Sequence, residues 1–225
     1  MIFQHPFTVG MAAIGRRSVI LCTCVLLISF LAFIPTSYGA EKKLLVLGDS
    51  ISAGYGLSQG QGWVTLLKKR LVQQGYDYQV VNASISGETT QGGLTRLPEL
   101  LRQHQPDLVL IELGGNDGLR GLPLTLMRNN LSRMIDLSQK AGTQPLLLGI
   151  QLPPNYGRRY TAAFSAIYPE LAEEKQVPFV PFILEKIALY PELMQADGIH
   201  PKAQAQPQLL NNIWPSLNPL LSKAP

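Results

Sequence analysis

Apolar residues along most of the chain gather in short runs, and stretches with helical spacing lie between these runs. Short apolar runs bounded by polar and turn-forming residues are typical of buried strands. Five such strands are expected, over residues 44–47, 78–81, 107–113, 144–150 and 179–182. The stretches between them repeat apolar residues every three or four positions, which predicts helices through residues 63–71, 94–101, 127–135 and 160–171.

Prolines affect the expected ends of these helices. Pro106 stops the second helix, and Pro123 takes the first position of the third, where a missing N–H costs nothing. A last helical stretch follows Lys202. We expect Pro207 and Pro215 to break it, because proline removes a helix hydrogen bond.

The alternation of strands and helices predicts an α/β fold. Strands that are apolar over their whole length are covered on both faces, as in parallel sheets. Right-handed crossovers then give a three-layer α/β/α sandwich with a central, mostly parallel five-stranded sheet. No repeat, low-complexity tract or linker interrupts the pattern, so residues 40–225 are predicted to form a single domain.

The first 39 residues have a different character. They hold no acidic residue, and Arg16 and Arg17 precede an almost wholly apolar run over residues 18–34. A basic head, an apolar stretch and small residues before a cleavage point are the three parts of a secretory signal. We therefore predict a signal peptide, cleaved near Gly39/Ala40, and an exported protein. The alternative is an uncleaved anchor, because the apolar run is close to the shortest length that spans a membrane.

Composition and charge narrow the chemistry. The chain is 46% hydrophobic and 15% charged, which is ordinary for a globular protein. Its formal charge of +4 falls to +2 once Arg16 and Arg17 are removed, so nothing points to nucleic acid. Cys22 and Cys24 both lie in the signal segment, and the mature chain can have neither a disulfide nor a cysteine nucleophile.

Polar clusters follow the first three predicted strands. They are Gly48-Asp49-Ser50, residues 82–88 and residues 114–117, and a fourth cluster, Asp197-Gly198-Ile199-His200, precedes the last helical stretch. In a parallel sheet, ligands bind outside the carboxyl ends of the strands. The four clusters could therefore meet at one edge of the sheet.

Histidine is scarce after the signal segment, where only His104 and His200 remain. His104 falls at the end of a predicted helix, a common place for a basic residue. His200 follows Asp197 by three residues, with a glycine between them and Pro201 behind, so a turn could fold the carboxylate onto the imidazole. Such a pair suits base catalysis, although a plain surface turn explains it equally well.

Ser50 lies where the first strand ends. An ordinary helix N-cap explains a serine there. Alternatively, its hydroxyl points out of the sheet edge as a nucleophile, and its N–H at a helix start stabilises an oxyanion. The Gly87 N–H and the Asn116 side chain could be further donors, although both residues also suit simple turns. Asp49 and Asp117 are expected to organise hydrogen bonds rather than react.

Metal and cofactor motifs are missing from the sequence. Two histidines and no cysteine leave little to coordinate zinc. Neither of the common glycine-rich phosphate loops occurs. No metal and no cofactor are therefore predicted.

The four clusters, in this order, resemble the conserved blocks of the SGNH (GDSL-like) hydrolases. The resemblance covers nearly all of residues 40–225 and implies a flavodoxin-like version of the three-layer fold. It assigns Ser50 as nucleophile, Asp197 and His200 as the rest of a catalytic triad, and Ser50, Gly87 and Asn116 as the oxyanion hole. It also implies a bacterial periplasmic location.

The resemblance further implies hydrolysis of acyl esters and thioesters, namely fatty acyl-CoA, aryl esters and lysophospholipids. It places a mobile lip over an acyl groove, with Leu119, Arg120, Gly121 and Leu122 as candidate residues. Gly56 lies in a nearby loop and could alter the contacts of this lip. We expect a monomer that meets the membrane only through its signal segment or a lipid substrate.

Two other functions remain open on the sequence. A carbohydrate O-deacetylase on the same scaffold would use the same triad. A non-enzymatic ligand-binding module would instead hold an anion at helix N-termini, but it would leave Asp197 and His200 without a role.

Overall fold

A sheet of five strands forms the centre of the fold, and every pair of neighbouring strands is parallel. The computed structural model describes residues 1–4 and 42–223. In chain order the strands are β1 (Lys42–Gly48), β2 (Tyr78–Asn82), β3 (Leu108–Glu112), β4 (Gln144–Leu148) and β5 (Phe179–Val180). Their order across the sheet is β2-β1-β3-β4-β5: β2 is added on one side of β1 and the later strands on the other, so the strand order switches sides between β1 and β3.

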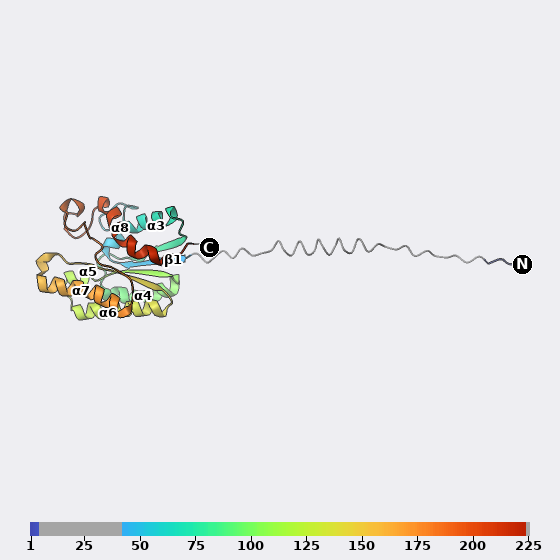
Figure 1. Cartoon of the computed structure of the whole chain (residues 1–225), viewed down its shortest axis with the longest axis horizontal. Coiled ribbons are helices and arrows are strands. Elements are labelled where there is room, and N and C mark those ends of the chain that lie inside the picture. The colour runs from blue at the N-terminus through green and yellow to red at the C-terminus, as the bar shows by residue number, and fades with distance from the viewer. Residues whose placement is uncertain (5–41, 224–225) are drawn as a thin grey trace. The chain divides into compact units, whose positions relative to one another are not determined.

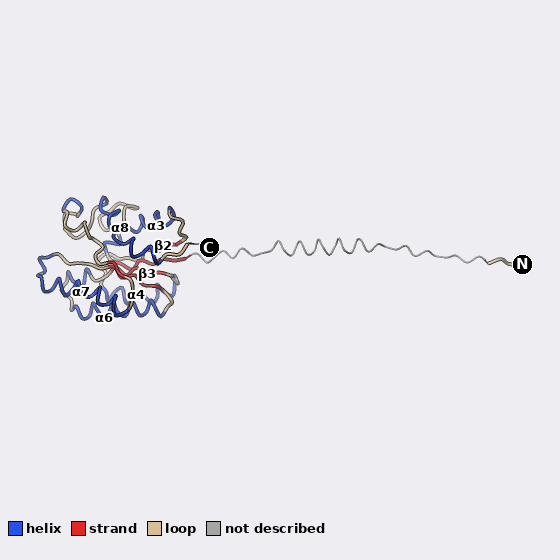
Figure 2. The backbone as a smooth tube through the Cα atoms, viewed as in Figure 1, coloured by secondary structure: helices blue, strands red, loops and turns tan. Residues whose placement is uncertain are grey.

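Helices cover both faces of this sheet (Figure 1). One face carries α3 (Trp63–Gln73) and α8 (Gln206–Leu217), which pack against each other. The other face carries α4 (Thr90–His104), α6 (Leu124–Lys140) and α7 (Arg158–Lys175). Figure 2 shows the strands between these two helical layers. The predicted three-layer α/β/α sandwich is confirmed.

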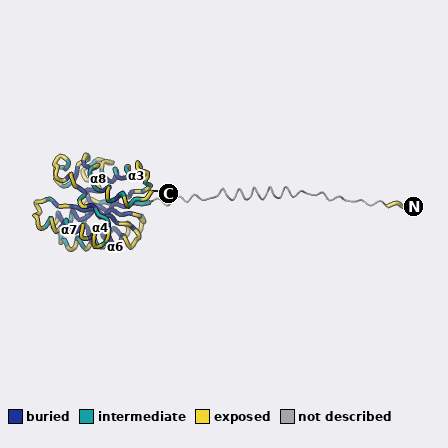
Figure 3. The backbone as a smooth tube through the Cα atoms, in the orientation of Figure 1, coloured by how far each residue is buried: buried dark blue, intermediate teal, exposed yellow. Residues whose placement is uncertain are grey.

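The core explains why the strand prediction worked. All five residues of β3 are buried, and four consecutive residues of β1, Leu44–Leu47, have no exposed surface. Burying a leucine or isoleucine side chain contributes roughly 1.5–3 kcal/mol. Burial is concentrated in the central sheet, while the outer helix faces are exposed (Figure 3). β5 has only two residues, which is why its sequence pattern is weak.

Helix ends differ from the expectation at three prolines. Pro123 is the N-cap of α6 rather than its first residue. The predicted break of the last helix was wrong, because α8 runs from Gln206 to Leu217. Pro207 falls in its first turn, where the N–H has no helical partner to lose. Pro215 falls in its last turn, where one lost hydrogen bond is offset by buried apolar side chains, including Ile213.

Two short helices and four short 3-10 segments complete the described part of the chain. The helices are α2 (Ser50–Ala53) and α5 (Gly115–Leu119), and both begin just after a strand. The 3-10 segments are η1 (Pro154–Tyr156), η2 (Pro191–Leu193), η3 (Ala203–Ala205) and η4 (Asn218–Leu220). Within residues 1–4 and 42–223, no helix has the length and apolar character needed to span a membrane.

The predicted signal peptide, residues 1–39, lies outside the described residues except for its first four. The chain does divide into two units after Gly39, the second being Ala40–Pro225. The cleavage and the single mature domain stay predictions.

Candidate active site

The turn from β1 into α2 presents Ser50 at the edge of the sheet. Asp49, and not Ser50, is the N-cap: its Oδ1 accepts a hydrogen bond from the Ile51 N–H at 3.0 Å. Ser50 is the first residue of the helix, so its hydroxyl is not used for capping. Gly54 closes α2 after one turn with a φ of 78°, a left-handed angle that glycine adopts without strain. The serine is thereby held at a tight strand-to-helix corner.

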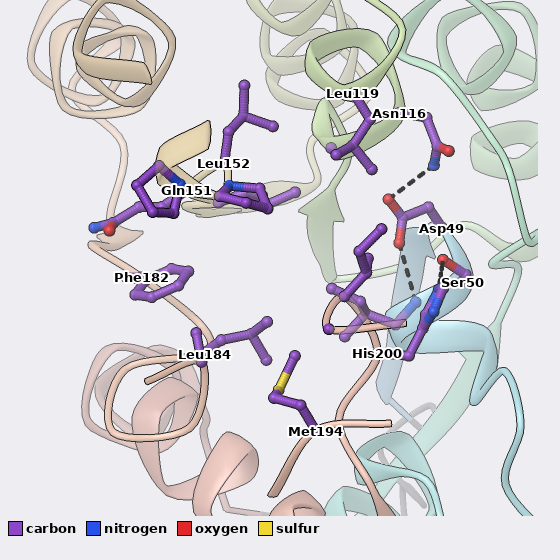
Figure 4. Close-up of a pocket in the computed structure, with 18 of the residues that line it drawn as sticks. Asp49, Ser50, Asn116, Leu119, Gln151, Leu152, Phe182, Leu184, Met194 and His200 are labelled. Carbon is purple, nitrogen blue, oxygen red and sulfur yellow. Dashed lines mark hydrogen bonds between the residues drawn. The ribbon is translucent and has the colours of Figure 1, made fainter. Parts of the chain in front are cut away.

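His200 and Asp197 lie beside this serine. His200 Nε2 is 2.8 Å from Ser50 Oγ, and His200 Nδ1 is 2.7 Å from Asp197 Oδ2. The Asp197 Oδ1 also accepts from the backbone N–H groups of Ile199 and His200, at 2.9 and 3.0 Å. Gly198, at a φ of 68°, lets the chain make this turn. The three side chains therefore form a continuous hydrogen-bonded row. Figure 4 shows the contact between His200 and Ser50.

The charge state of Asp197 follows from these contacts. Partial burial alone would raise its pKa, but the hydrogen bonds from His200 and Ile199 outweigh burial and lower the pKa to about 2. Asp197 is thus an anion at neutral pH. The Asp197 carboxylate next to Nδ1 keeps the proton on that nitrogen, so Nε2 faces Ser50 as an acceptor.

A loop after α2 supports the imidazole from the other side. The Tyr55 ring lies 4.6 Å from the His200 ring, centroid to centroid. Gln195 links the two, because its side chain donates to the Tyr55 carbonyl at 2.8 Å and its N–H donates to the His200 carbonyl at 2.7 Å. Gly56 faces Gln195 rather than the predicted lip, so the expected effect of Gly56 on the lip finds no contact here.

The three candidate oxyanion donors occupy different places. Asn116 lies two residues after Gly114, whose φ of 120° makes the turn from β3 into α5. The Asn116 Nδ2 is 3.2 Å from Asp49 Oδ2. The N–H groups of Ser50 and Gly87 donate no hydrogen bond within the described residues. Ser50 and Asn116 line the same cavity as His200, whereas Gly87 is not part of its wall. The carbonyl of Gly87 accepts from Arg120 Nη2 at 2.9 Å.

A cavity of about 480 Å³ opens beside Ser50. Its walls are mainly apolar and include Leu119, Ile150, Leu152, Phe182, Leu184 and Met194. Leu152, Phe182 and Leu184 lie across the cavity from Ser50 and His200 (Figure 4). Most of this wall comes from the segments that follow β4 and β5. Sequence reasoning missed them because it searched strand ends for polar side chains only.

The predicted lip is only partly at the cavity. Leu119, the last residue of α5, lines it. Arg120 and Gly121 are exposed, Leu122 is half-buried, and none of these three is part of the wall. Asp117 is buried and accepts from the Thr90 N–H at 2.9 Å, so it ties α5 to the start of α4 as expected of an organising residue.

Two buried carboxyl groups lie at the turn that carries Ser50, and of these the sequence singled out only Asp49. Glu112 is the last residue of β3 and is fully buried, and its Oε2 accepts from the Asp49 N–H at 3.2 Å. Burial raises the pKa of Asp49 to about 6, although hydrogen bonds from Ile51 and Asn116 and the nearby His200 oppose the rise. Burial and the neighbouring Asp49 raise the pKa of Glu112 well above its ordinary value.

An acid inside an otherwise apolar strand was the available hint for Glu112. As for metals, no group of three or more histidine, cysteine or acidic residues within residues 1–4 and 42–223 could hold an ion.

Comparison with known proteins identifies the family. Residues 46–206 match the GDSL-like Lipase/Acylhydrolase family. The chain is 53% identical over 205 residues to the Esterase TesA of Pseudomonas aeruginosa, covering 91% of this chain and 100% of the relative. It is 49% identical over 193 residues to the Thioesterase 1/protease 1/lysophospholipase L1 of Escherichia coli, covering 86% and 91%.

A crystal structure of TesA superposes with a TM-score of 0.79 at 57% identity, covering 80% of this chain and 100% of the other. The chain therefore belongs to the GDSL-like lipase/acylhydrolase family of ester-hydrolysing enzymes.

Proposed function

We propose that the protein hydrolyses acyl esters and thioesters of fatty acids through an acyl-enzyme formed on Ser50. The row of Asp197, His200 and Ser50, with contacts of 2.7 and 2.8 Å, carries this proposal. A nucleophile within hydrogen-bond reach of a base, which a third group orients in turn, is the arrangement that covalent catalysis requires. Neither a metal nor a cofactor is needed for it.

The contacts support the following sequence of events. His200 Nε2 takes the Ser50 proton as Oγ attacks the acyl carbon. The bond from that carbon to the alcohol oxygen or thiol sulfur then breaks, and the imidazolium returns the proton to the leaving group. Water, deprotonated by the same nitrogen, attacks the acyl carbon of the acyl-enzyme. The bond from that carbon to Ser50 Oγ breaks, the imidazolium returns the proton to Oγ, and the fatty acid is released. Asp197 stabilises the imidazolium in both halves of the reaction.

The tetrahedral intermediate needs donors for its oxyanion. We assign the N–H groups of Ser50 and Gly87 and the Asn116 amide to this role. Both N–H groups lack another acceptor within the described residues, and the Asn116 amide has a second N–H beyond the one that faces Asp49. Donors fixed in advance by backbone turns stabilise developing charge without reorganising.

The cavity favours a fatty acyl chain over an acetyl group on a sugar. Its far wall is formed by Leu152, Phe182 and Leu184, which offer apolar contacts but few hydrogen bonds. A carbohydrate ligand would need polar partners for its hydroxyl groups. Each buried CH₂ of a fatty chain gains roughly 0.8 kcal/mol. Carbohydrate O-deacetylation stays the second candidate, because the triad serves both reactions.

A chain-length series tests this assignment. Hydrolysis of p-nitrophenyl esters and acyl-CoA thioesters from acetyl to palmitoyl should give kcat/KM values that rise by at least about tenfold from the two-carbon chain to the best chain. An acetylated sugar assayed beside them should be a poorer substrate than the octanoyl ester. Faster turnover of the acetylated sugar would favour the deacetylase.

We also propose that the protein is exported to the periplasm and acts there as a monomer. The basic and apolar order of residues 1–39 supports export. Contact with a membrane would then come only through this segment or through a lipid substrate.

A further inference from the structure

Glu112 is a buried carboxyl group to which the proposed mechanism gives no step. It lies at the carboxyl end of the central strand, directly under the turn that carries Ser50, and has no exposed surface. Its side chain lies close to the backbone of that turn: a Cβ added to Gly48 would come within 2.7 Å of Glu112 Oε2. An acid is therefore enclosed where the nucleophile is positioned.

The hydrogen bonds around Glu112 have fixed directions. The Trp63 indole can only donate, and its Nε1 lies 3.2 Å from Ser52 Oγ. The Ser52 hydroxyl is therefore free to give its own proton to Glu112 Oε2, at 2.7 Å. The Asp49 N–H donates to the same oxygen. Oε2 thus acts as an acceptor only, and it fixes α2 and the Asp49 backbone to β3.

The second oxygen is in a different situation. Oε1 has no hydrogen-bond partner among the described residues. A carboxylate charge on a buried oxygen without a donor is far more costly than a neutral hydroxyl there. The adjacent Asp49 carboxylate, in contrast, accepts from Ile51 and Asn116. The negative charge is better supported on Asp49 than on Glu112.

We propose that Glu112 is a positioning residue that holds the nucleophile turn as a neutral carboxylic acid, with its proton on Oε1, and leaves the single charge of the pair on Asp49. This inference rests on the proposed role of Ser50. The neutral acid keeps a second negative charge away from the site where the oxyanion forms. It also leaves Asp49 as the anion that orients the Asn116 amide.

The other titratable groups around Glu112 agree with this arrangement. The Tyr168 hydroxyl, from α7, donates to the Leu113 carbonyl at 3.1 Å and so gives no hydrogen bond to Glu112. Burial raises the pKa of Glu112 well above its usual range, in the direction that the neutral acid requires. Burial also raises the pKa of Tyr168, so its hydroxyl is neutral at pH 7. Burial raises the pKa of Asp49 to about 6, while the hydrogen bond from the Ile51 N–H and the charge of His200 oppose the rise.

Infrared spectroscopy tests the protonation state directly. The difference spectrum of wild type minus Glu112→Gln at pH 7 should contain the C=O band of a protonated carboxylic acid. Glu170→Gln, an exposed glutamate on α7, is the matched control and should show only the bands of a lost carboxylate. Carboxylate bands in the Glu112 difference spectrum would overturn the proposal.

The pH dependence of unfolding gives a second, independent readout. A carboxyl whose pKa is raised by folding stabilises the fold fully below its unfolded pKa of about 4.3, and this stability is lost as pH rises through the folded pKa. Glu112→Gln removes that titration. The melting temperature of Glu112→Gln minus that of wild type should therefore increase as pH increases from 5 to 9. Parallel curves would contradict a neutral acid.

Kinetics separate positioning from mere packing. Glutamine keeps an acceptor oxygen for Ser52 and Asp49, so Glu112→Gln should retain kcat/KM within about threefold of wild type. Glu112→Ala leaves the Ser52 hydroxyl and the Asp49 N–H without an acceptor, so its kcat should fall by at least about tenfold. Fluorophosphonate labelling of Ser50 should persist in Glu112→Gln. If wild type itself is not labelled, the proposed nucleophile fails, while the infrared and unfolding results still decide the state of Glu112.

Discussion

Asn116 has two tasks at the scale of single residues. Its side-chain amide must be held near Ser50, and it must still have a donor for the oxyanion. The contact of 3.2 Å with Asp49 uses one of its two N–H groups and leaves the other free. The Asp49 carboxylate that caps α2 thereby also positions the amide that we propose as an oxyanion donor.

Replacing Asn116 by alanine should lower turnover by about a hundredfold or more, because one oxyanion donor is lost. The change should appear in kcat with p-nitrophenyl butyrate, with little change in KM. Asn116 is half-buried, so the thermal unfolding curve should stay close to that of wild type. An unchanged kcat would remove Asn116 from the oxyanion site.

Individual residues differed in how far the sequence could reveal them. His200 stood out because histidine is scarce and because Asp197 precedes it by one turn. Glu112 was harder to recognise: an acid at the end of an apolar strand is the only local signal, and nothing nearby in the sequence shows that Ser52 and Asp49 will bind it. Asp49 and Ser52 precede Glu112 by 63 and 60 residues, and only the folded sheet brings them together.

Among the structural elements, the loop after α2 and the turn that carries His200 depend on each other. Gly56 has a φ of 72°, and a Cβ on it would lie 2.9 Å from both Cδ and Nε2 of Gln195. The Gln195 amide donates a hydrogen bond to the Tyr55 carbonyl, and the ring of Tyr55 contacts the His200 imidazole. A side chain at position 56 must therefore displace Gln195, and through it the support of His200.

Gly56→Ala should lower kcat by about tenfold through this displacement. Gly60→Ala is the matched control, because Gly60 has a φ of 88° in the same loop but no neighbour within 4 Å of an added Cβ. Both variants should lose roughly 1–3 kcal/mol of stability from backbone strain. Only Gly56→Ala should lose activity in an esterase assay. Equal losses of activity in both variants would show that the effect does not come from displacing Gln195.

Helices and strands were predictable where the pattern of apolar residues extended over enough positions to be recognised. The five strands were anticipated from their apolar runs, and the helices α3, α4, α6 and α7 from the regular face that each helix buries. The short helices α2 and α5, with four and five residues, are too brief to show a period. The last helix was misjudged because burial of its apolar face outweighs the cost of Pro215, a balance that local rules do not contain.

Export belongs to the scale of the whole molecule. When the full-length gene is expressed in a bacterium, the periplasmic fraction should contain a protein whose N-terminus is Ala40, because signal peptidase cuts after small residues. N-terminal sequencing of that fraction checks the prediction. A protein that stays in the membrane fraction with residues 1–39 attached would instead support an uncleaved anchor.

The five-stranded sheet makes the site possible, since parallel strands bring residues from distant parts of the sequence to one edge. The proposed site residues Ser50, Gly87, Asn116 and the pair Asp197/His200 come from four different loops. The central claim is that Ser50 is the nucleophile. A fluorophosphonate, which forms a covalent bond with an activated serine, tests it most directly when the labelled peptide is identified by mass spectrometry.

The account predicts one adduct per chain, located on Ser50, together with loss of labelling and of p-nitrophenyl butyrate hydrolysis in Ser50→Ala. An adduct on another residue, or labelling that persists in Ser50→Ala, would contradict it.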